Sequence, residues 1–280
     1  MDKLKIKARG ISMEVTGKDD FIQREREAFL EYVEKHEGIQ IGATTIPAER
    51  LRPSSEHMNC KCSCDIDYIR TVKRHHKMNW LELAEKIKKG TILIDVGTTV
   101  SCELTDSTQV EFVVTDVTDE YVRFETRNFI GGEVEWNGQH INNGGYPDSY
   151  VRRYIDSVIW NLLPADLQAV ISDVDREWKD RDGNCGVYTT KLFLPAASEI
   201  FNDDVCRGDN GLYEQLDYYK DARNRVRVDE DGNIRVYWLA SIKSDSSTYA
   251  CTVCANGRDD HWGVSDSRHI PVCFQISKIS

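Results

Sequence analysis

Two cysteines near the carboxyl end are close enough in sequence to suggest a reactive pair. Cys251 and Cys254 form a CxxC motif within STYACTVCANG. Redox chemistry requires the two sulfur atoms to meet, but residues three apart on a β-strand point to opposite faces of the sheet. Unless the strand turns here, we expect one buried and one exposed thiol that do not react with each other.

A second group of cysteines has the residue types that bind zinc. Cys60, Cys62 and Cys64 follow His57 closely, and thiolates and imidazole are preferred zinc ligands. Structural zinc sites usually pair two short-spaced couples of ligands across a longer loop, and this stretch lacks the second couple unless His75 and His76 supply it. Whether these three cysteines bind metal stays open, and metal analysis of freshly purified protein tests it. The odd total of nine cysteines favours mostly reduced thiols.

Other patterns for catalysis are weak. Asp180, Asp182 and Asn184 in DRDGN resemble the start of a calcium loop, but the glycine comes early and no closing glutamate follows, which favours a turn. No serine lies in a nucleophile elbow, and no glycine-rich phosphate loop is present in the sequence. We therefore predict no catalytic residue and no cofactor.

Polar and aromatic side chains are instead concentrated in two predicted loops, 244–249 and 256–269, which lie between alternating apolar segments typical of half-buried strands. Tyr, Trp and Arg carry most of the energy in protein recognition, and Ser and Asn add adaptable polar contacts. Trp262 has no apolar neighbours in sequence, so it either folds back on the core or faces a partner. The predicted ligand-binding residues are Trp238, Ser244, Asp245, Ser247, Tyr249, Asn256, Arg258, Asp260, His261, Trp262, Asp266 and Arg268.

Regular elements that could support these loops begin at Asn79, which is a predicted helix cap with Glu82 at the third helical position. Apolar residues on one face continue this helix to Gly90, and the segments VSCEL, VEFVVTDV and YVRFET predict an antiparallel meander. Asp148 is the predicted cap of a second helix that Pro164 ends. A tight hairpin is predicted at residues 229–233.

These elements predict an α+β domain over residues 78–280. The start of the chain alternates apolar and polar residues and continues into a helical pattern, which indicates a small ββα module over residues 1–36. Residues 37–77 contain prolines, serines and a basic stretch without periodicity, and we interpret them as a connector.

Composition restricts the partners. The chain has 280 residues and a net charge of −11, which disfavours nucleic acid as the main partner. No stretch is apolar enough for a membrane span, and the charged start MDKLKIKARG lacks the apolar core of a secretory signal. We therefore expect synthesis in a cytoplasm and no membrane span.

Several strings occur in an order that resembles a known family. They are GTTVSCELTDSTQVEFVV, NNGGYPDSYVRRYIDSVIWNLLPADLQAVI, KLFLPAASEIF, YEQLDYYKDARNRV, VYWLASIKSDSS and HIPVCFQI. Together they resemble a family of domains carried by phage and prophage proteins, itself similar to the formylglycine-generating-enzyme type of C-type lectin fold. Some relatives with this fold are target proteins of diversity-generating retroelements, whose C-terminal loops vary.

The resemblance implies a C-type-lectin-like domain that displays variable C-terminal loops as a tail-associated, receptor-recognition protein of a phage or prophage. Its ligand would be a protein or glycan on a bacterial cell surface, and residues 1–77 would attach it to other virion or tail proteins. Release as part of a virion would bring it outside the cell. Homo-oligomers would add avidity to weak sites. Two alternatives stay open: a copper-dependent thiol oxidase of the formylglycine-generating type that uses Cys251 and Cys254, and a purely structural virion subunit.

Overall fold

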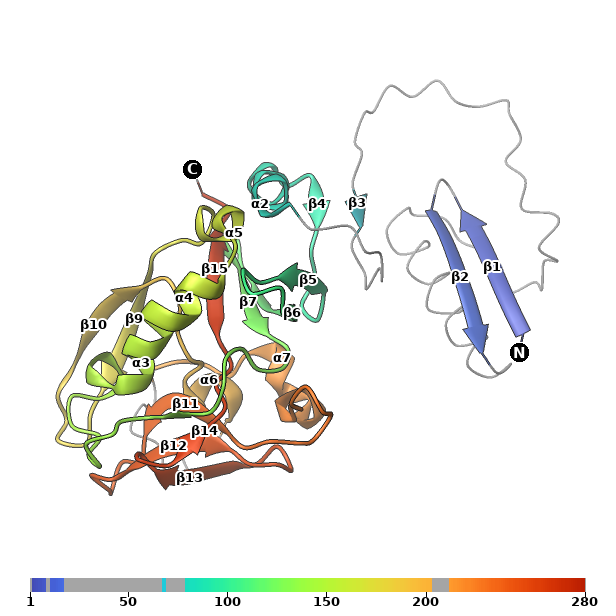
Figure 1. The fold of residues 1–280 in the computed structure, drawn as a ribbon. Helices are drawn as coiled ribbons and strands as arrows, with labels where there is room; N and C mark the ends of the chain where they lie inside the picture. The colour runs from blue at the N-terminus through green and yellow to red at the C-terminus, as the bar shows by residue number, and fades with distance from the viewer. Residues whose placement is uncertain (1, 9–10, 18–66, 69–78, 203–211, 280) are drawn as a thin grey trace, which may run out of the picture. The chain divides into compact units, whose positions relative to one another are not determined.

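The computed structural model describes residues 2–8, 11–17, 67–68, 79–202 and 212–279 (Figure 1). Contacts between Cα atoms divide the chain into two units, Met1–Ser63 and Cys64–Ser280. The division lies inside the stretch that the sequence indicated as a connector. Within the described ranges, every helix is too short or too polar to cross a bilayer.

The first unit contains one antiparallel hairpin. Strands β1 (Asp2–Ala8) and β2 (Ile11–Gly17) pair along their whole length, with Asp2 opposite Gly17 and Ala8 opposite Ile11. This confirms the predicted hairpin at the start of the chain. The helix expected after it, the cysteine cluster Cys60, Cys62 and Cys64 and the basic stretch 70–77 lie outside the described residues.

The second unit is mixed α and β, with mostly antiparallel sheets and few helices, which agrees with the α+β class (Figure 1). Its central sheet has four antiparallel strands in the order β15-β7-β6-β5. These strands are β5 (Thr99–Glu103), β6 (Gln109–Val117), β7 (Tyr121–Thr126) and β15 (Cys273–Ser277). The predicted meander is therefore confirmed, and the end of the chain joins it beside β7.

Helix α2 (Trp80–Lys89) packs against this sheet. Its cap is Asn79, whose side chain accepts a hydrogen bond from the Glu82 N–H, and it ends at Gly90 in the left-handed conformation, φ 61°. Trp80 inserts between Phe112, Phe124 and Phe274, with ring centroids 5.7–5.9 Å apart in edge-on geometry. The predicted helix is correct, and its buried indole belongs to the apolar core.

The second long helix differs from the prediction in two ways. It runs as α3 (Tyr150–Tyr154), a π-helical turn η3 (Ile155–Ile159) and α4 (Trp160–Leu162). Its cap is Ser149 rather than Asp148, because the Ser149 hydroxyl accepts from the Arg152 N–H. The π turn adds a residue to the helical period, so Val158, expected in the core, is 43% exposed.

Short elements complete the unit. They are β3 (Asp67–Tyr68), which pairs in parallel with β4 (Ile92–Leu93), and β8 (Val134–Glu135), which pairs with β14 (Ser267–Arg268). The hairpin of β9 (Val174–Lys179) and β10 (Cys185–Thr190) lies beside the long helix (Figure 1). The remaining helical turns are η2 (Tyr146–Asp148), α5 (Ala165–Gln168), α6 (Ala197–Ile200), α7 (Asp217–Lys220) and η4 (Ala222–Arg225).

Candidate functional site

Five of the twelve residues predicted to bind a ligand lie on a second antiparallel sheet with the order β11-β12-β13, and the others lie in the turns beside it or in β14. Its strands are β11 (Tyr237–Ile242), β12 (Tyr249–Val253) and β13 (Asp259–Gly263). The stretch 256–269, expected as one long loop, therefore contains an edge strand. Pairing of β13 with β12 along five residues, from Tyr249–Gly263 to Val253–Asp259, is the reason for this difference.

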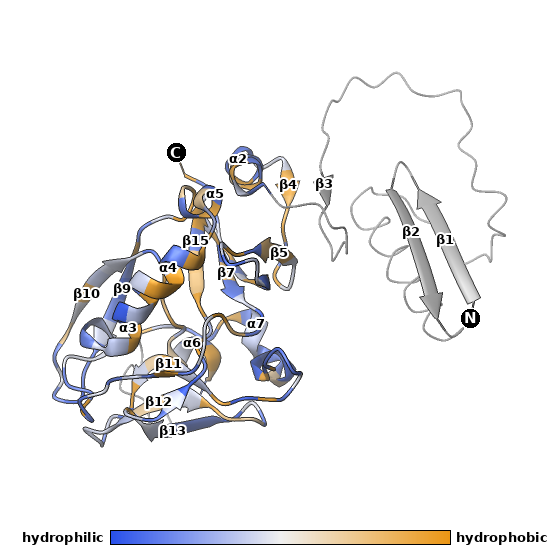
Figure 2. Ribbon diagram, viewed as in Figure 1, coloured by the Kyte–Doolittle hydropathy of each residue, from blue (hydrophilic) through white to orange (hydrophobic). Residues whose placement is uncertain are grey.

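The frame of this sheet is apolar, whereas its edge is polar. Tyr237, Trp238 and Leu239 in β11 are all 0% exposed, and β12 is buried from Ala250 to Val253. In Figure 2 the outer strand β13 has hydrophilic colours. The sheet therefore holds one polar strand rigidly against two buried ones.

Trp238 was predicted to contact a ligand, and this prediction is wrong. Its side chain is fully buried, and its indole Nε1–H donates to the Val134 carbonyl at 2.8 Å. A buried tryptophan that satisfies its own donor is a packing residue. Through this hydrogen bond Trp238 holds β11 against β8, and it supports the site without facing a ligand.

Two aromatic pairs mark the outer strand. Tyr249 is 40% exposed and meets the His261 ring edge-on at 5.3 Å. Trp262 is 38% exposed, and the Arg268 guanidinium lies over its ring at 4.0 Å. His261 and Trp262 are neighbours in β13, so their side chains point to opposite faces of the sheet. Of the two alternatives for Trp262, partial exposure beside a cation favours the surface.

Asp266 completes the group around Trp262. Its carboxylate lies 3.8 Å from Arg268 Nη2, and its backbone N–H donates to the Gly263 carbonyl. Asp260, on the same face of β13 as Trp262, accepts the His261 N–H at 2.8 Å. This N–H faces away from β12, on the side where a further strand could pair with β13. The hydrogen bond to the Asp260 carboxylate makes the N–H unavailable for such pairing. We call Tyr249, His261, Trp262, Asp266 and Arg268 the aromatic edge.

The turn between β11 and β12 lies at the same end of the sheet as Tyr249 and contains Ser244, Asp245 and Ser247. Lys243 pairs with Asp245 and lowers the pKa of that carboxyl. Asn142 fixes this turn from outside the sheet. Its side-chain amide donates to the carbonyls of Ser246 and Tyr249 at 2.7 and 2.8 Å, and its backbone N–H donates to Ser247. Asn142 is fully buried; it begins one of the strings quoted above, but its role in the turn was not predicted.

Asn256 and Arg258 lie at the opposite end, in the turn between β12 and β13. Four residue steps along the strand separate the two ends, or roughly 13 Å. The side-chain Oδ1 of Asn256 accepts from the Arg258 N–H and from the Cys254 thiol, so Asn256 shapes the turn. Gly257 has φ 78°, and a Cβ there would approach the Ala222 carbonyl at 3.1 Å. Because the two ends of the sheet are separate, the structure does not bring Asn256 and Arg258 together with the aromatic edge.

The CxxC thiols have separate environments. Cys251 is buried, and its Sγ donates to the Ile242 carbonyl at 3.3 Å. Cys254 is partly exposed after the end of β12, and its Sγ donates to the side-chain Oδ1 of Asn256 at 2.8 Å. Neither thiol forms a disulfide. One buried and one exposed thiol is the arrangement that the strand geometry predicted.

Metal-binding geometry is absent from the described part of the chain, where no three His, Cys, Asp or Glu side chains form a group that could hold an ion. The DRDGN stretch forms a turn in which the Asp180 carboxylate accepts from the N–H and the side-chain amide of Asn184, both at 2.8 Å. The predicted turn is confirmed. Its carboxylate is occupied by the chain itself.

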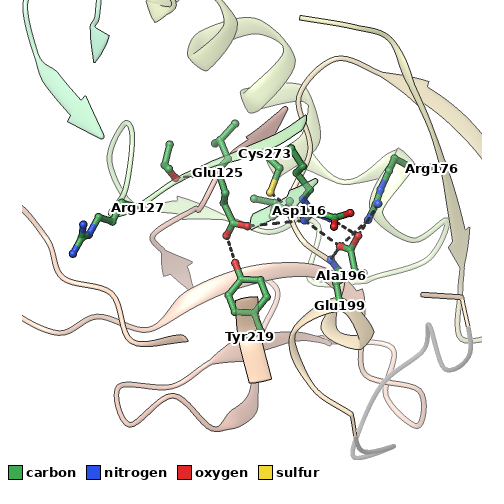
Figure 3. A network of polar contacts seen from close by, with 12 residues as sticks. Asp116, Glu125, Arg127, Arg176, Ala196, Glu199, Tyr219 and Cys273 are labelled. Atoms are coloured by element: carbon green, nitrogen blue, oxygen red, sulfur yellow. Dashed lines mark hydrogen bonds and ion pairs between the residues drawn. The ribbon is translucent and has the colours of Figure 1, made fainter. Parts of the chain in front are cut away.

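A buried network of charges lies under the site and was not predicted (Figure 3). Glu199 in α6 accepts hydrogen bonds from Arg123 of β7 and Arg176 of β9, and its Oε2 also accepts the Ala196 N–H at 2.7 Å. Burial alone would raise the pKa of Glu199, but the two guanidinium groups outweigh it and lower that pKa to about 2. The carboxylate therefore stays charged inside the protein.

The second half of this network surrounds Glu125 of β7. The Tyr219 hydroxyl donates to Glu125 Oε1 at 2.6 Å, and the Arg227 guanidinium forms an ion pair with the same oxygen. Arg123 Nη2 lies 4.0 Å from Glu125 Oε2 and 3.4 Å from Cys273 Sγ, which connects the two halves. Burial raises the pKa of Cys273 well above its ordinary value, which favours the protonated thiol.

Comparison with known proteins assigns a family to this fold. A family model described as Domain of unknown function (DUF6273) matches residues 114–278, which is more than half of the chain. The chain belongs to the DUF6273 family. No curated protein and no solved structure matches it. The match begins in β6, and the pairing of β5 with β6 places part of the same sheet before the DUF6273 region.

Proposed function

We propose that this DUF6273 protein is a ligand-binding module whose recognition surface is the aromatic edge together with the β11–β12 turn. One observation carries the proposal: Tyr249, at the start of β12, and Trp262, in the edge strand β13, are 40% and 38% exposed, whereas the rest of β12 and most of β11 are buried. A half-exposed aromatic ring on a rigid frame presents contact area with little loss of side-chain entropy on binding. Such anchors dominate recognition energies.

The setting of this module is part of the proposal. We propose that it is a C-type-lectin-like domain that serves a phage or prophage particle and binds a protein or glycan on a bacterial cell. The support is the ordered set of motifs quoted above, together with the antiparallel sheets and few helices of the second unit. Attachment to other virion proteins through residues 1–77 belongs to the same proposal.

Binding of fluorescently labelled protein to a panel of whole bacterial cells and to an array of bacterial surface glycans tests the recognition surface. The double variant Tyr249→Ala and Trp262→Ala removes both exposed rings of the aromatic edge. We expect it to lose at least roughly tenfold in affinity for every cell or glycan that the unchanged protein binds. The variant Arg258→Ala, at the far end of the sheet, is the matched control and should retain binding.

Equal binding by the double variant and the unchanged protein would show that the aromatic edge is not the recognition surface. Incorporation of the double variant into particles, with adsorption unchanged, would instead support a structural virion subunit.

The thiol-oxidase alternative draws no support from the environments of Cys251 and Cys254. The first thiol is buried, and the second is engaged by Asn256. Copper titration combined with oxygen consumption on a cysteine-containing peptide tests this alternative directly, and uptake of oxygen that disappears in Cys251→Ser would establish it.

A further inference from the structure

A hollow on another part of the second unit lies beside the long helix. It has a volume of about 400 Å³, and its lining residues come from two chain segments. One wall is the helix formed by α3, η3 and α4, and the other is the end of β10 with the residues that follow it. Figure 1 shows this helix alongside the β9–β10 hairpin. None of its lining residues belongs to the aromatic edge.

The helical wall is a single row of three side chains. Arg152, Asp156 and Trp160 are four residues apart, and such residues lie one above the other on a helix. Steps of four drift slowly around an α-helix, but the wider π turn over 155–159 counters this drift. The π turn therefore aligns a guanidinium, a carboxylate and an indole along one side of the hollow. π turns of this kind occur frequently at functional sites.

The polar groups of this row are only partly satisfied by the protein. Arg152 Nε lies 3.4 Å from Asp156 Oδ2 as an ion pair, yet this buried Nε–H has no hydrogen-bond acceptor. Burial raises the pKa of Asp156, although Arg152 and Thr190 act in the opposite direction. The Asp156 side chain is still 42% exposed, so its carboxylate can accept hydrogen bonds from a bound molecule.

The opposite wall supplies a cation and hydroxyl groups. The Lys191 ammonium lies 6.0 Å from the centre of the Trp160 ring and is held by the Ile171 carbonyl at 3.1 Å and by Asp173 at 3.4 Å. Thr189 and Thr190 line the same wall. Trp160 itself is partly exposed and packs on the apolar core with its other side. The ring therefore has a fixed position in the hollow.

We infer that this hollow binds a sugar ring, with Trp160 as the stacking platform and Asp156 as the acceptor of its hydroxyl hydrogens. A sugar ring has an apolar C–H face and a rim of hydroxyls that both donate and accept. The indole matches the face, the carboxylate matches the donors, and the Lys191 ammonium matches the acceptors. The hydroxyls of Thr189 and Thr190 donate to Asp175 and to the Leu192 carbonyl, so their oxygens can only accept from the rim of the sugar. Arg152 pairs with Asp156 and Lys191 pairs with Asp173, so the hollow carries little net charge and suits a neutral ligand.

This site lies apart from the recognition surface proposed above, so the two can be tested separately. The chain has six tryptophans, and ¹H–¹⁵N spectra resolve each indole N–H of the full protein, with Trp160→Phe assigning the signal of Trp160. The probes are D-glucose, D-galactose, N-acetyl-D-glucosamine and L-rhamnose, each titrated to about 50 mM because single sugars bind weakly. At least one probe should shift the Trp160 signal in a saturable way.

Three variants distinguish a sugar bound in this hollow from a sugar bound elsewhere on the protein. Asp156→Asn preserves the size of the side chain and should weaken the bound sugar roughly tenfold through the loss of charge-assisted hydrogen bonds. Val158→Ala changes an exposed residue of the same helix outside the hollow and should leave the titration unchanged. Trp262→Ala, in the aromatic edge, should also leave it unchanged.

The inference is overturned if no probe shifts the Trp160 signal, or if Asp156→Asn binds every probe as tightly as the unchanged protein. It is also overturned if a sugar response disappears in Trp262→Ala but persists in Asp156→Asn, because the sugar would then occupy the aromatic edge. Loss of cell binding on changing Tyr249 and Trp262, with the Trp160 titration intact, would support two separate sites.

Discussion

Asn142 controls the position of the β11–β12 turn with one side chain. Its amide nitrogen serves two carbonyls of the turn, those of Ser246 and Tyr249, in a fully buried position. The loss of such a donor leaves a partly buried carbonyl without its hydrogen bond, which costs free energy. The conformation presented by Ser244, Asp245 and Ser247 therefore depends on a residue about a hundred positions earlier in the chain.

Replacing Asn142 with Ala should therefore lower the free energy of unfolding by about 1–3 kcal/mol, since the Ser246 carbonyl loses this donor and the Tyr249 carbonyl keeps only the Lys243 N–H. Asn161→Ala is the matched control. Its amide also donates to a backbone carbonyl, that of Ser157, but at an exposed position, so its cost should be within about 0.5 kcal/mol. Urea denaturation of both variants measures the difference. Equal costs would mean that the Asn142 amide does not hold the turn.

The sequence identified the exposed members of the candidate site better than the supporting ones. Tyr249, His261, Trp262 and Arg268 were predicted because aromatic and cationic types gather between alternating apolar segments. Trp238 was mistaken for a member because strand alternation does not show which strands are covered on both faces. Asn142 and Glu199 were missed because their partners lie far away in sequence, and only the fold brings these residues together.

At the scale of elements, local signals determined most of the secondary structure. The cap at Asn79, the glycine at Gly90 and the alternation in the first meander predicted α2 and β5–β7 nearly to the residue. The prediction failed at β13, whose residues DDHWG have no strand pattern of their own. This strand forms because the backbone of β12 pairs with it, so a tertiary interaction overrides the weak local preference of these residues.

The π turn in the long helix is the clearest case of a tertiary departure from a periodic pattern. An α-helical period predicted both Val151 and Val158 in the core, yet Val151 is fully buried and Val158 is 43% exposed. The same substitution at both positions therefore tests the π turn. Val151→Ala should cost about 2 kcal/mol for the lost burial and the cavity, whereas Val158→Ala should stay within about 0.5 kcal/mol.

Thermal or urea unfolding of the two valine variants provides this comparison. Similar losses at the two positions would contradict the π turn and restore a regular helix with Val158 in the core.

For the second unit as a whole, the buried charge network joins elements from distant parts of the sequence. Arg123 and Glu125 belong to the central sheet, Arg176 to the β9–β10 hairpin, and Glu199 and Tyr219 to helices that pack against β11. Removing one partner of a buried ion pair leaves an uncompensated charge. We therefore expect the network to couple the supporting sheet to the sheet that carries the aromatic edge.

The variant Glu199→Gln preserves the shape of the side chain but leaves two buried guanidinium groups without their carboxylate. We expect it to lower the free energy of unfolding by about 3–5 kcal/mol. Asp221→Asn is the control, because Asp221 pairs with Arg223 at an exposed position and its loss should barely change the unfolding midpoint. Denaturation with urea at pH 7 compares the two, and a Glu199 variant as stable as the control would mean that the network does not stabilise the fold.

Acid should weaken the second unit through the same carboxylate. Its pKa is about 2 in the folded protein and 4.5 ordinarily, so the unfolded chain binds the proton more readily. This stability is fully present above pH 4.5 and disappears as the pH falls through the folded pKa, with a total near 3 kcal/mol, or roughly 1.4 kcal/mol per pH unit. Burial also lowers the pKa of His269, so its protonation reduces the stability at a higher pH, beginning just below pH 6.5.

Urea denaturation at pH 7, 5, 4 and 3 should show a steeper loss of stability below pH 5 in the unchanged protein than in Glu199→Gln. Parallel curves for the two proteins would exclude Glu199 as the source of the acid sensitivity.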